Sequence, residues 1–273
     1  MTAGFAPVGR LLLLGGGNMG GAMLRGWMER GLDPASVTIL DPNPSPALGA
    51  LFERGVRHAA SAPAEPQDVV ILAVKPQVLA EAVAPLRPAL KDGTLVISVA
   101  AGRTVAFIEA QLGARPVVRA MPNTPALIGR GITGAYANER VTPGLRSTAT
   151  DLLSASGPVE WVPSEDDIDR VTAVSGSGPA YVFLLAEALA EAGVRAGLEP
   201  GLAMRLARHT VAGAGELMIR SDDAPDQLRR NVTSPKGTTE AALGVLMADD
   251  GLRPLMTRAV AAARERAVEL SKG

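Results

Sequence analysis

The stretch Leu11-Leu12-Leu13-Leu14-Gly15-Gly16-Gly17-Asn18-Met19-Gly20 decides the fold that the sequence predicts. Four consecutive leucines are typical of a strand buried on both faces, and the residues after them fit the pattern G-x-G-x-x-G. Gly15 permits a tight turn, Gly17 lets a pyrophosphate approach the backbone, and Gly20 lets a helix pack closely on the strand. The stretch therefore predicts a strand, a turn and a helix N-terminus that binds a dinucleotide.

Short apolar runs alternate with helical segments on the C-terminal side of this loop. Alternation with short turns is typical of a parallel sheet covered by helices on both faces, so the first half is predicted to be a Rossmann-type doubly wound α/β domain. The predicted strands are Val8–Leu14, Val37–Leu40, Val69–Val74, Leu95–Val99 and Val117–Met121, with weaker candidates around Tyr136 and at Val159–Val162. The predicted helices are Met19–Arg30, Ala47–Arg54, Pro76–Leu90 and Thr104–Leu112, with a turn at Lys91-Asp92-Gly93.

Strand signals almost disappear from Ser164 onward, and Ser164 is a plausible helix N-cap. We therefore expect two domains, 1–163 and 164–273, of which the second is all-helical. The segment Pro179–Ala196 is apolar on nearly every side, so as a helix it must be buried, and in so small a domain a subunit interface provides the cover. Further helices are expected at Pro200–Arg220, Thr239–Ala248 and Pro254–Leu270.

The composition excludes several kinds of site. The chain has no cysteine, which rules out disulfides, thiol nucleophiles and thiolate metal sites, and its two histidines, His58 and His209, are not expected to act directly. A balance of 27 basic and 28 acidic residues, with 3% aromatics, argues against a nucleic-acid or anionic-membrane surface. The apolar runs are too short for a signal peptide or a membrane span. We expect a soluble cytoplasmic protein without a metal.

Asp41 ends the second predicted strand, about 20 residues beyond the glycine-rich loop. Its carboxylate could accept a hydrogen bond from a ribose 2′-hydroxyl and favour NAD, or Asp41-Pro42 could simply end the strand. No arginine lies within Pro42–Leu51 to pair with a 2′-phosphate. Ala73-Val74-Lys75-Pro76 and Arg119–Pro125 also follow strands, where an open α/β sheet binds ligands, although each could be a loop fixed by proline.

Two segments of the second half could contact a small ligand. Val174–Tyr181 includes two glycines and two serines, which either only break a helix, with Ser177 as a cap, or let the backbone approach a ligand closely. Asn231–Thr239 precedes a helix, whose N-terminal N–H groups suit a carboxylate, although an ordinary capped turn would look the same. Lys236 in this segment is expected to be a solvated loop lysine.

Six segments together resemble the pyrroline-5-carboxylate reductase family. They occur in the family's order over nearly the whole chain, and the combination of the fifth and sixth is much more specific than the nucleotide loop. The segments are Leu14–Met19, Ala73-Val74-Lys75-Pro76, Ser98–Gly102, Met121–Pro125, Ser175-Gly176-Ser177-Gly178-Pro179-Ala180-Tyr181 and Ser234-Pro235-Lys236-Gly237-Thr238-Thr239. The resemblance implies reduction of L-1-pyrroline-5-carboxylate to L-proline with NADP(H) or NAD(H), the last step of proline biosynthesis.

The resemblance also implies residue roles and an assembly. Thr239 would hydrogen-bond the ring nitrogen and act in catalysis, and the substrate would be bound by Ser234, Gly237, Thr238 and Ser177. The cofactor would be bound by Gly15, Gly17, Asn18, Met19, Asp41, Ala73, Val74, Lys75, Pro76 and Asn123. The helical domain would interlock with its copy into a homodimer, and family dimers often assemble further into decamers. Lys236 stands where the family usually has glycine, and the choice between NADPH and NADH stays open.

Two other functions share parts of this pattern. A β-hydroxyacid-type dehydrogenase has the same nucleotide loop but needs a catalytic lysine in the first long helix of the second domain, and no lysine lies between Lys91 and Lys236. A non-catalytic nucleotide sensor could use the same fold. The intact turn at residues 234–239, which suits a carboxylate, argues against a sensor.

Overall fold

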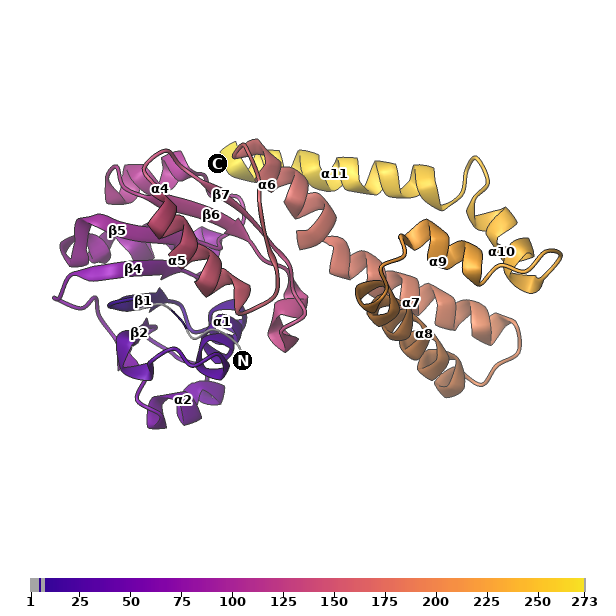
Figure 1. Cartoon of the computed structure of the whole chain (residues 1–273), viewed down its shortest axis with the longest axis horizontal. Coiled ribbons are helices and arrows are strands. Elements are labelled where there is room, and N and C mark those ends of the chain that lie inside the picture. The colour runs from indigo at the N-terminus through magenta and orange to yellow at the C-terminus, as the bar shows by residue number, and fades with distance from the viewer. Residues whose placement is uncertain (1–4, 6–7, 273) are drawn as a thin grey trace. The chain divides into compact units, whose positions relative to one another are not determined.

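The computed structural model describes Phe5 and residues 8–272 (Figure 1). By their internal contacts these residues form two compact units. Unit 1 comprises the described residues of Met1–Gly176 and Ala263–Gly273, and unit 2 comprises Ser177–Ala262. The chain therefore passes between the units twice, and the second passage lies inside the last helix.

Unit 1 extends further along the chain than the domain boundary expected near residue 163. The helix Asp166–Val171 follows that boundary but packs on two strands of the sheet, Val117–Met121 and Thr133–Ala137. The end of the last helix also belongs to unit 1. Packing on the sheet, rather than the point where the strand pattern stops, thus sets the limits of the compact units.

Unit 1 is built around one sheet of eight strands. In chain order these are β1 (Leu11–Leu14), β2 (Val37–Leu40), β3 (Arg57–Ala59), β4 (Gln67–Leu72), β5 (Leu90–Ser98), β6 (Val117–Met121), β7 (Thr133–Ala137) and β8 (Val159–Trp161). Their spatial order is β3-β2-β1-β4-β5-β6-β7-β8, and all neighbours are parallel except the antiparallel pair β6 and β7. The strand order reverses between β1 and β4, which makes this the switch point of a doubly wound sheet. The predicted α/β fold is confirmed.

Helices make up the remaining regular structure of unit 1 and all regular structure of unit 2. Unit 1 holds α1 (Asn18–Glu29), α2 (Gly49–Glu53), α3 (Leu79–Val83), α4 (Val105–Leu112), α5 (Pro143–Ser154), α6 (Asp166–Val171), a π-helical turn (Thr172–Gly176) and the 3₁₀ helices η1 (Pro34–Ser36), η2 (Pro46–Leu48), η3 (Pro76–Val78), η4 (Ala84–Ala89) and η5 (Thr124–Ile128). Unit 2 holds α7 (Gly178–Arg195), α8 (Pro200–Arg220), α9 (Pro225–Asn231) and α10 (Thr238–Leu246). The last helix, α11 (Leu252–Lys272), is shared by the two units.

The four leucines of β1 supply both faces of the sheet with apolar side chains. Leu11 and Leu13 belong to one core cluster, which includes Trp27 of α1, whereas Leu12 and Leu14 belong to a second cluster with residues of α3 and α4. All four leucines are buried. Successive side chains of a strand point to opposite faces, so an unbroken apolar strand is stable only where helices cover both sides.

Three local predictions were wrong for identifiable reasons. The helix expected over Pro76–Leu90 is divided into η3, α3 and η4, and α3 ends before η4 because the prolines at 85 and 88 lack the N–H that a regular helix needs. Lys91–Gly93 belongs to β5 instead of forming a turn. The hydroxyl of Ser164 donates to Asp167 Oδ2 at 2.7 Å instead of capping the helix that follows.

The start of α8 illustrates how a single side chain fixes a helix end. The carboxylate of Glu199 accepts hydrogen bonds from the N–H groups of Gly201 at 2.8 Å and Leu202 at 2.7 Å. These backbone bonds, that of Gly201 first, hold the pKa of Glu199 below its ordinary value. The cap explains why α8 begins at Pro200, as the sequence predicts.

A buried arginine ties three elements of unit 1 together. Arg119 of β6 is only 3% exposed and donates to Asp169 Oδ1 at 2.8 Å and to Glu165 Oε1 at 3.2 Å. The hydroxyl of Ser271, near the end of α11, donates to Asp169 Oδ1 at 3.2 Å. A charge taken out of water is tolerated only when it is paired in this way. The network therefore fastens α6 and the end of α11 to the sheet.

We expect Asp169→Asn to lower the free energy of unfolding of unit 1 by about 3 kcal/mol, because Arg119 then keeps its charge in a buried position with one carboxylate fewer. Urea unfolding followed by tryptophan fluorescence measures this, since Trp27 and Trp161 both lie in unit 1. Asp166→Asn removes the same charge three residues away and is the control. Equal unfolding midpoints for the two variants would contradict the role given to Asp169.

Unit 2 buries almost none of its large apolar side chains against itself. Its buried apolar residues are the small ones Ala190, Ala203 and Ala207, whereas Phe183 is 64% exposed. Other exposed apolar side chains lie on every helix of the unit except α9, and they include Leu184, Leu185, Leu206, Leu217, Ile219, Val245 and Leu255. The helix expected over residues 179–196 forms as α7, and its apolar side chains present an exposed surface that marks a site of interaction.

One helical stretch among the described residues, Asp166–Arg195, is long and apolar enough to cross a membrane by length and composition. The stretch includes most of the segment Pro179–Ala196, which was expected to be covered at a subunit interface, and the apolar runs of the sequence were expected to be too short for a span. A single such helix is weak evidence of a membrane, because the core helix of a soluble protein passes the same test.

Candidate functional site

The carboxyl ends of β1, β2 and β4 meet at the switch point of the sheet. The N–H of Gly15 donates to Leu40 O at 3.0 Å, and the N–H of Ala73 donates to Leu14 O at 2.8 Å. Gly15 has φ +98°, and a Cβ atom on it would lie 2.8 Å from Ala73 O. Only glycine fits this position, so the turn after β1 lies directly on the backbone that follows β4.

The start of α1 presents exposed backbone to solvent. Gly17 is its N-cap without a side-chain cap, and a Cβ on Gly17 would meet no atom within 4 Å. The N–H groups of Asn18, Met19 and Gly20 have no hydrogen-bond partner within the described part of the chain. A Cβ on Gly20, by contrast, would lie 2.1 Å from Gly15 O. These glycines fit the separate roles predicted for them, with free N–H groups and open space where an anionic ligand would approach.

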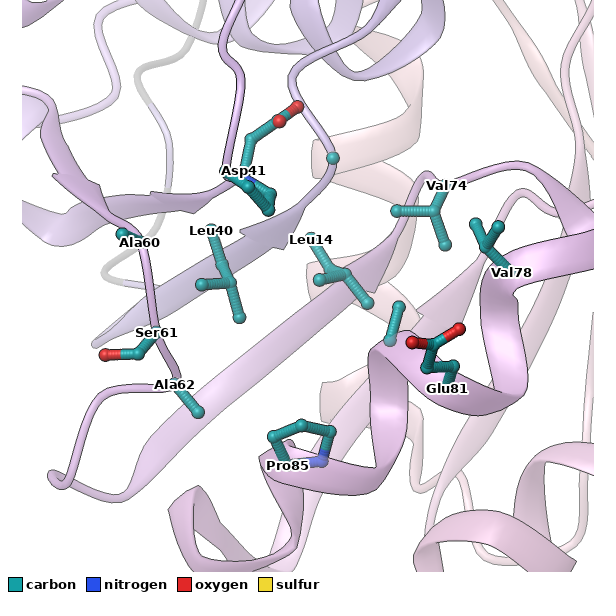
Figure 2. Close-up of a pocket in the computed structure, with 13 residues that line it drawn as sticks. Leu14, Leu40, Asp41, Ala60, Ser61, Ala62, Val74, Val78, Glu81 and Pro85 are labelled. Atoms are coloured by element: carbon teal, nitrogen blue, oxygen red, sulfur yellow. The ribbon is translucent and has the colours of Figure 1, made fainter.

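Asp41 follows β2 and faces the glycine-rich loop. Its Oδ2 accepts from the N–H of Gly16 at 2.7 Å, and its Oδ1 accepts from the N–H of Asn43 at 2.9 Å. Figure 2 shows the carboxylate extending from the end of the strand toward the loop after β1. The two bonds fix the carboxylate, and each oxygen keeps a further lone pair for another donor.

A pocket of about 590 Å³ opens between these strand ends and α3 (Figure 2). Its size is that of an ordinary ligand site, and most of its surface is apolar. Three residues predicted to bind a cofactor line it, namely Gly15, Asp41 and Val74. The other lining residues are Leu14, Leu40, Pro42, Ala60, Ser61, Ala62, Val78, Glu81, Ala82 and Pro85.

The remaining cofactor candidates lie around this pocket or beyond it. Lys75 is the N-cap of η3, and Pro76, the first residue of η3, accepts from Arg103 Nε at 3.2 Å through its carbonyl. Asn123 follows β6 and uses both ends of its amide inside unit 1. Its Nδ2 donates to Ser175 Oγ at 3.3 Å, and its Oδ1 accepts from the N–H of Ile132 at 3.0 Å. Asn123 thus joins the loop after β6 to the π-helical turn.

The turn before α10 holds three of the predicted substrate residues, Ser234, Gly237 and Thr238, together with Thr239, whereas Ser177 lies before α7. The N–H of Gly237 donates to Ser234 O at 3.0 Å and closes the turn, and α10 begins at Thr238, one residue earlier than expected. Within the described residues, the N–H groups of Thr238 and Thr239 have no hydrogen-bond partner. The hydroxyls of Ser234, Thr238 and Thr239 are likewise without a partner there. A cluster of donors without acceptors at a helix N-terminus suits a small carboxylate.

Two other residues of unit 2 differ from simple expectation. Lys236 adopts φ +59°, a left-handed conformation that glycine takes without strain, and its N–H donates to Glu240 Oε2 at 2.7 Å. Ser177 precedes α7 but makes no side-chain cap, so its hydroxyl is not needed for the helix. The glycine-rich break before α7 is a π-helical turn that runs almost directly into the next helix.

Comparisons with known proteins match nearly the whole chain to one family. The family model "Pyrroline-5-carboxylate reductase dimerisation" matches residues 165–270, and the model "NADP oxidoreductase coenzyme F420-dependent" matches residues 10–102. The pyrroline-5-carboxylate reductase of Pseudomonas aeruginosa is 42% identical over 266 residues, which cover 96% of this chain and 97% of the relative. This chain belongs to the pyrroline-5-carboxylate reductase family.

Solved structures of family members agree with this assignment. The pyrroline-5-carboxylate reductase of Coxiella burnetii has a TM-score of 0.90 at 40% identity, covering 97% of this chain and 100% of that one. The Plasmodium falciparum enzyme, solved with NADP bound, has a TM-score of 0.81 at 29% identity, covering 96% and 98%. The predicted family and the Rossmann-type domain followed by a helical dimerisation domain are confirmed.

Part of the pocket wall in this reductase was not predicted from the sequence. Ala60, Ser61 and Ala62 follow β3, and Glu81 comes from α3. Small residues in a loop carry no pattern that marks a binding site, and Glu81 has the appearance of a solvated helix residue. The loop after β3 could have been considered, since it follows a strand next to the one that Asp41 ends.

We expect Gly17→Ala to fold normally but to bind NADH and NADPH roughly tenfold more weakly, because its methyl group enters only the open space beside the free N–H groups. Gly20→Ala is the matched comparison, and it should destabilise unit 1 since its Cβ meets Gly15 O. Calorimetric titration with each cofactor and thermal unfolding separate the two effects. Unaltered cofactor affinity in Gly17→Ala would refute the proposed approach of the ligand.

Proposed function

We propose that this chain reduces L-1-pyrroline-5-carboxylate to L-proline with NAD(P)H, the last step of proline biosynthesis. The observation that carries the proposal is the match to curated reductases over nearly the full length of both chains. The bound nicotinamide supplies the hydride, which no protein side chain can supply. The chain itself binds and orients the two reactants, and it assists protonation of the ring nitrogen.

The nucleotide is assigned to the carboxyl edge of the sheet in unit 1. Gly15, Gly17, Asn18 and Met19 would bind its pyrophosphate at the start of α1, and open space above Gly17 supports this fit. Asp41 would bind the adenosine ribose. Ala73, Val74, Lys75 and Pro76 would border the nucleotide after β4. Asn123 would neighbour the nicotinamide, because its amide keeps one N–H and one lone pair beside its bonds to Ser175 and Ile132.

The substrate carboxylate is assigned to the turn before α10. Ser234 and Thr238 offer hydroxyls, and the N–H groups that begin α10 add donors and the positive end of the helix dipole. Gly237 would shape this turn, because its own N–H closes it onto Ser234 O. Ser177, whose hydroxyl caps nothing, is a further substrate contact. Lys236 adds a positive charge next to the same turn.

Thr239 is assigned to the ring nitrogen. A cyclic imine accepts hydride at carbon once its nitrogen is protonated or hydrogen-bonded, so a strong protein acid is not required. The free hydroxyl of Thr239 can orient the imine through this nitrogen and assist its protonation. Holding the imine carbon against the hydride donor then lowers the entropy cost of the reaction.

The reaction is tested by the loss of reduced-cofactor absorbance when the purified protein meets L-1-pyrroline-5-carboxylate. No loss with either NADH or NADPH would refute the proposed function.

We expect Thr239→Ala to lower kcat/KM roughly 100-fold while cofactor affinity stays near that of the unsubstituted protein. Thr239→Ser keeps the hydroxyl and is the control, which should remain close to full activity. Equal turnover in both variants would reject the role of Thr239.

We also propose that the helical domain, residues 164–273, forms a homodimer and that dimers assemble into a decamer. The match to the dimerisation model and the exposed apolar side chains of unit 2 support self-association. We further propose a cytoplasmic protein that binds neither nucleic acid nor membrane. The balance of 27 basic and 28 acidic residues supports the absence of a nucleic-acid surface.

We expect Phe183→Glu to weaken dimerisation by at least about 30-fold, because a charge would replace a large exposed aromatic side chain of α7. Phe183→Leu keeps an apolar side chain and serves as the control. Sedimentation equilibrium over a concentration series measures the shift from dimer to monomer. Dimers of undiminished affinity in Phe183→Glu would contradict this interface.

Cell fractionation tests the proposed location separately. Recovery of the unsubstituted protein in the membrane fraction would contradict a cytoplasmic location.

A further inference from the structure

We infer that this chain discriminates in favour of NADH and against NADPH, and that Asp41 and Glu81 are the residues that do so. The inference rests on the proposed function only in that a nicotinamide dinucleotide binds at the switch point of the sheet. It does not follow from the relatives, since one matching family model is named for NADP and one solved relative binds NADP. It follows from the groups that line the pocket of this chain.

The first reason is the position of the Asp41 carboxylate. It lies at the end of β2, and the N–H groups of Gly16 and Asn43 hold it at 2.7 and 2.9 Å. One lone pair on each oxygen remains to accept a hydrogen bond, and a ribose with free 2′- and 3′-hydroxyls offers two donors. The 2′-phosphate of NADPH replaces one donor by a group that carries between one and two negative charges at neutral pH.

The second reason is the charge of the pocket as a whole. Among the described residues that line it, the ionisable ones are Asp41 and Glu81, both acidic. In Figure 2 they lie on opposite sides of the pocket, one at the end of β2 and the other on α3. A phosphate in this pocket would meet two carboxylates and no lining lysine, arginine or histidine in the described part of the chain. Like charges brought together in a partly enclosed site repel each other strongly.

The third reason concerns three basic side chains around β2 and β3, each of which is placed away from the pocket. The ring of His58 stands next to Phe52, and its Nε2 lies 2.7 Å from the backbone carbonyl of Asp41. Arg57 pairs in register with Thr38, so it lies toward the amino end of β3 and away from the edge where Asp41 lies. Arg54 reaches back to the carbonyl of Met28. None of the three belongs to the lining of the pocket.

The test is calorimetric titration of the full-length protein with NADH and with NADPH in the absence of substrate, at one fixed ionic strength. We expect NADH to bind at least about tenfold more tightly. Binding of NADPH with equal or higher affinity would overturn the inference. If neither cofactor binds, both this inference and the proposed function fail. If both bind and the imine is reduced, but NADPH binds more tightly, only this inference fails.

Variants then test whether the two carboxylates are responsible. Glu81→Gln should tighten NADPH binding severalfold and NADH binding by less, and Asp41→Ser should weaken NADH and strengthen NADPH. Asp92→Asn removes an equal charge from exposed strand residues outside the pocket, so the ratio of the two affinities should not change. Ala62→Arg adds a cation to the pocket wall and should favour NADPH. A ratio that moves equally in Asp92→Asn and Glu81→Gln would show a general charge effect and overturn the assignment.

Discussion

The close approach of the Gly15 turn to the backbone after β4 is the constraint on which the nucleotide site depends. A Cβ on Gly15 would lie 2.8 Å from Ala73 O, and a Cβ on Gly20 would lie 2.1 Å from Gly15 O. Any side chain at either position would push α1 away from the sheet. The Gly16 N–H would then leave Asp41, and the pocket wall formed by Gly15 and Val74 would open. Two missing side chains thus position the free N–H groups, the carboxylate and the pocket together.

The two compact units are stabilised by different means. Unit 1 has apolar strands covered on both faces, and its few buried charges are paired, as Arg119 is with Asp169 and Glu165. Unit 2 has alanines at its helix contacts and large apolar side chains on its surface. In the proposed dimer, unit 1 would be stabilised by its own folding and unit 2 largely by association, so the stability of unit 2 would depend on protein concentration. The match to a dimerisation family accounts for a surface that would otherwise be an aggregation hazard.

The sequence predicted best the elements that local signals define, namely buried strands and helices with a clear first residue. The bounds of β2, β6 and α8 were predicted to the residue, because buried strands are mostly apolar and end at proline or polar residues, and α8 has a clear start at Pro200. Prediction from the sequence failed where residues distant in the chain determine the local structure or the hydrogen-bond partners. Lys91–Gly93 has the composition of a turn but extends β5, and the partners of Asn123 lie 9 and 52 residues away. The pocket wall at residues 60–62 consists of small side chains that carry no periodic signal.

Asp41 combines a structural and a selective role, and this limits how cofactor choice can change. Its Oδ2 holds the Gly16 N–H, so replacing it removes both the negative charge and a bond that shapes the glycine-rich loop. Glu81 and residues 60–62 line the same pocket, and no side-chain hydrogen bond joins any of them to the glycine-rich loop in the described part of the chain. A change of charge at these positions alters the electrostatic field in the pocket without loosening the turn. Substitutions in the loop after β3 and in α3 could therefore favour a cofactor with a 2′-phosphate, while the Asp41 carboxylate continues to fix the glycine-rich loop.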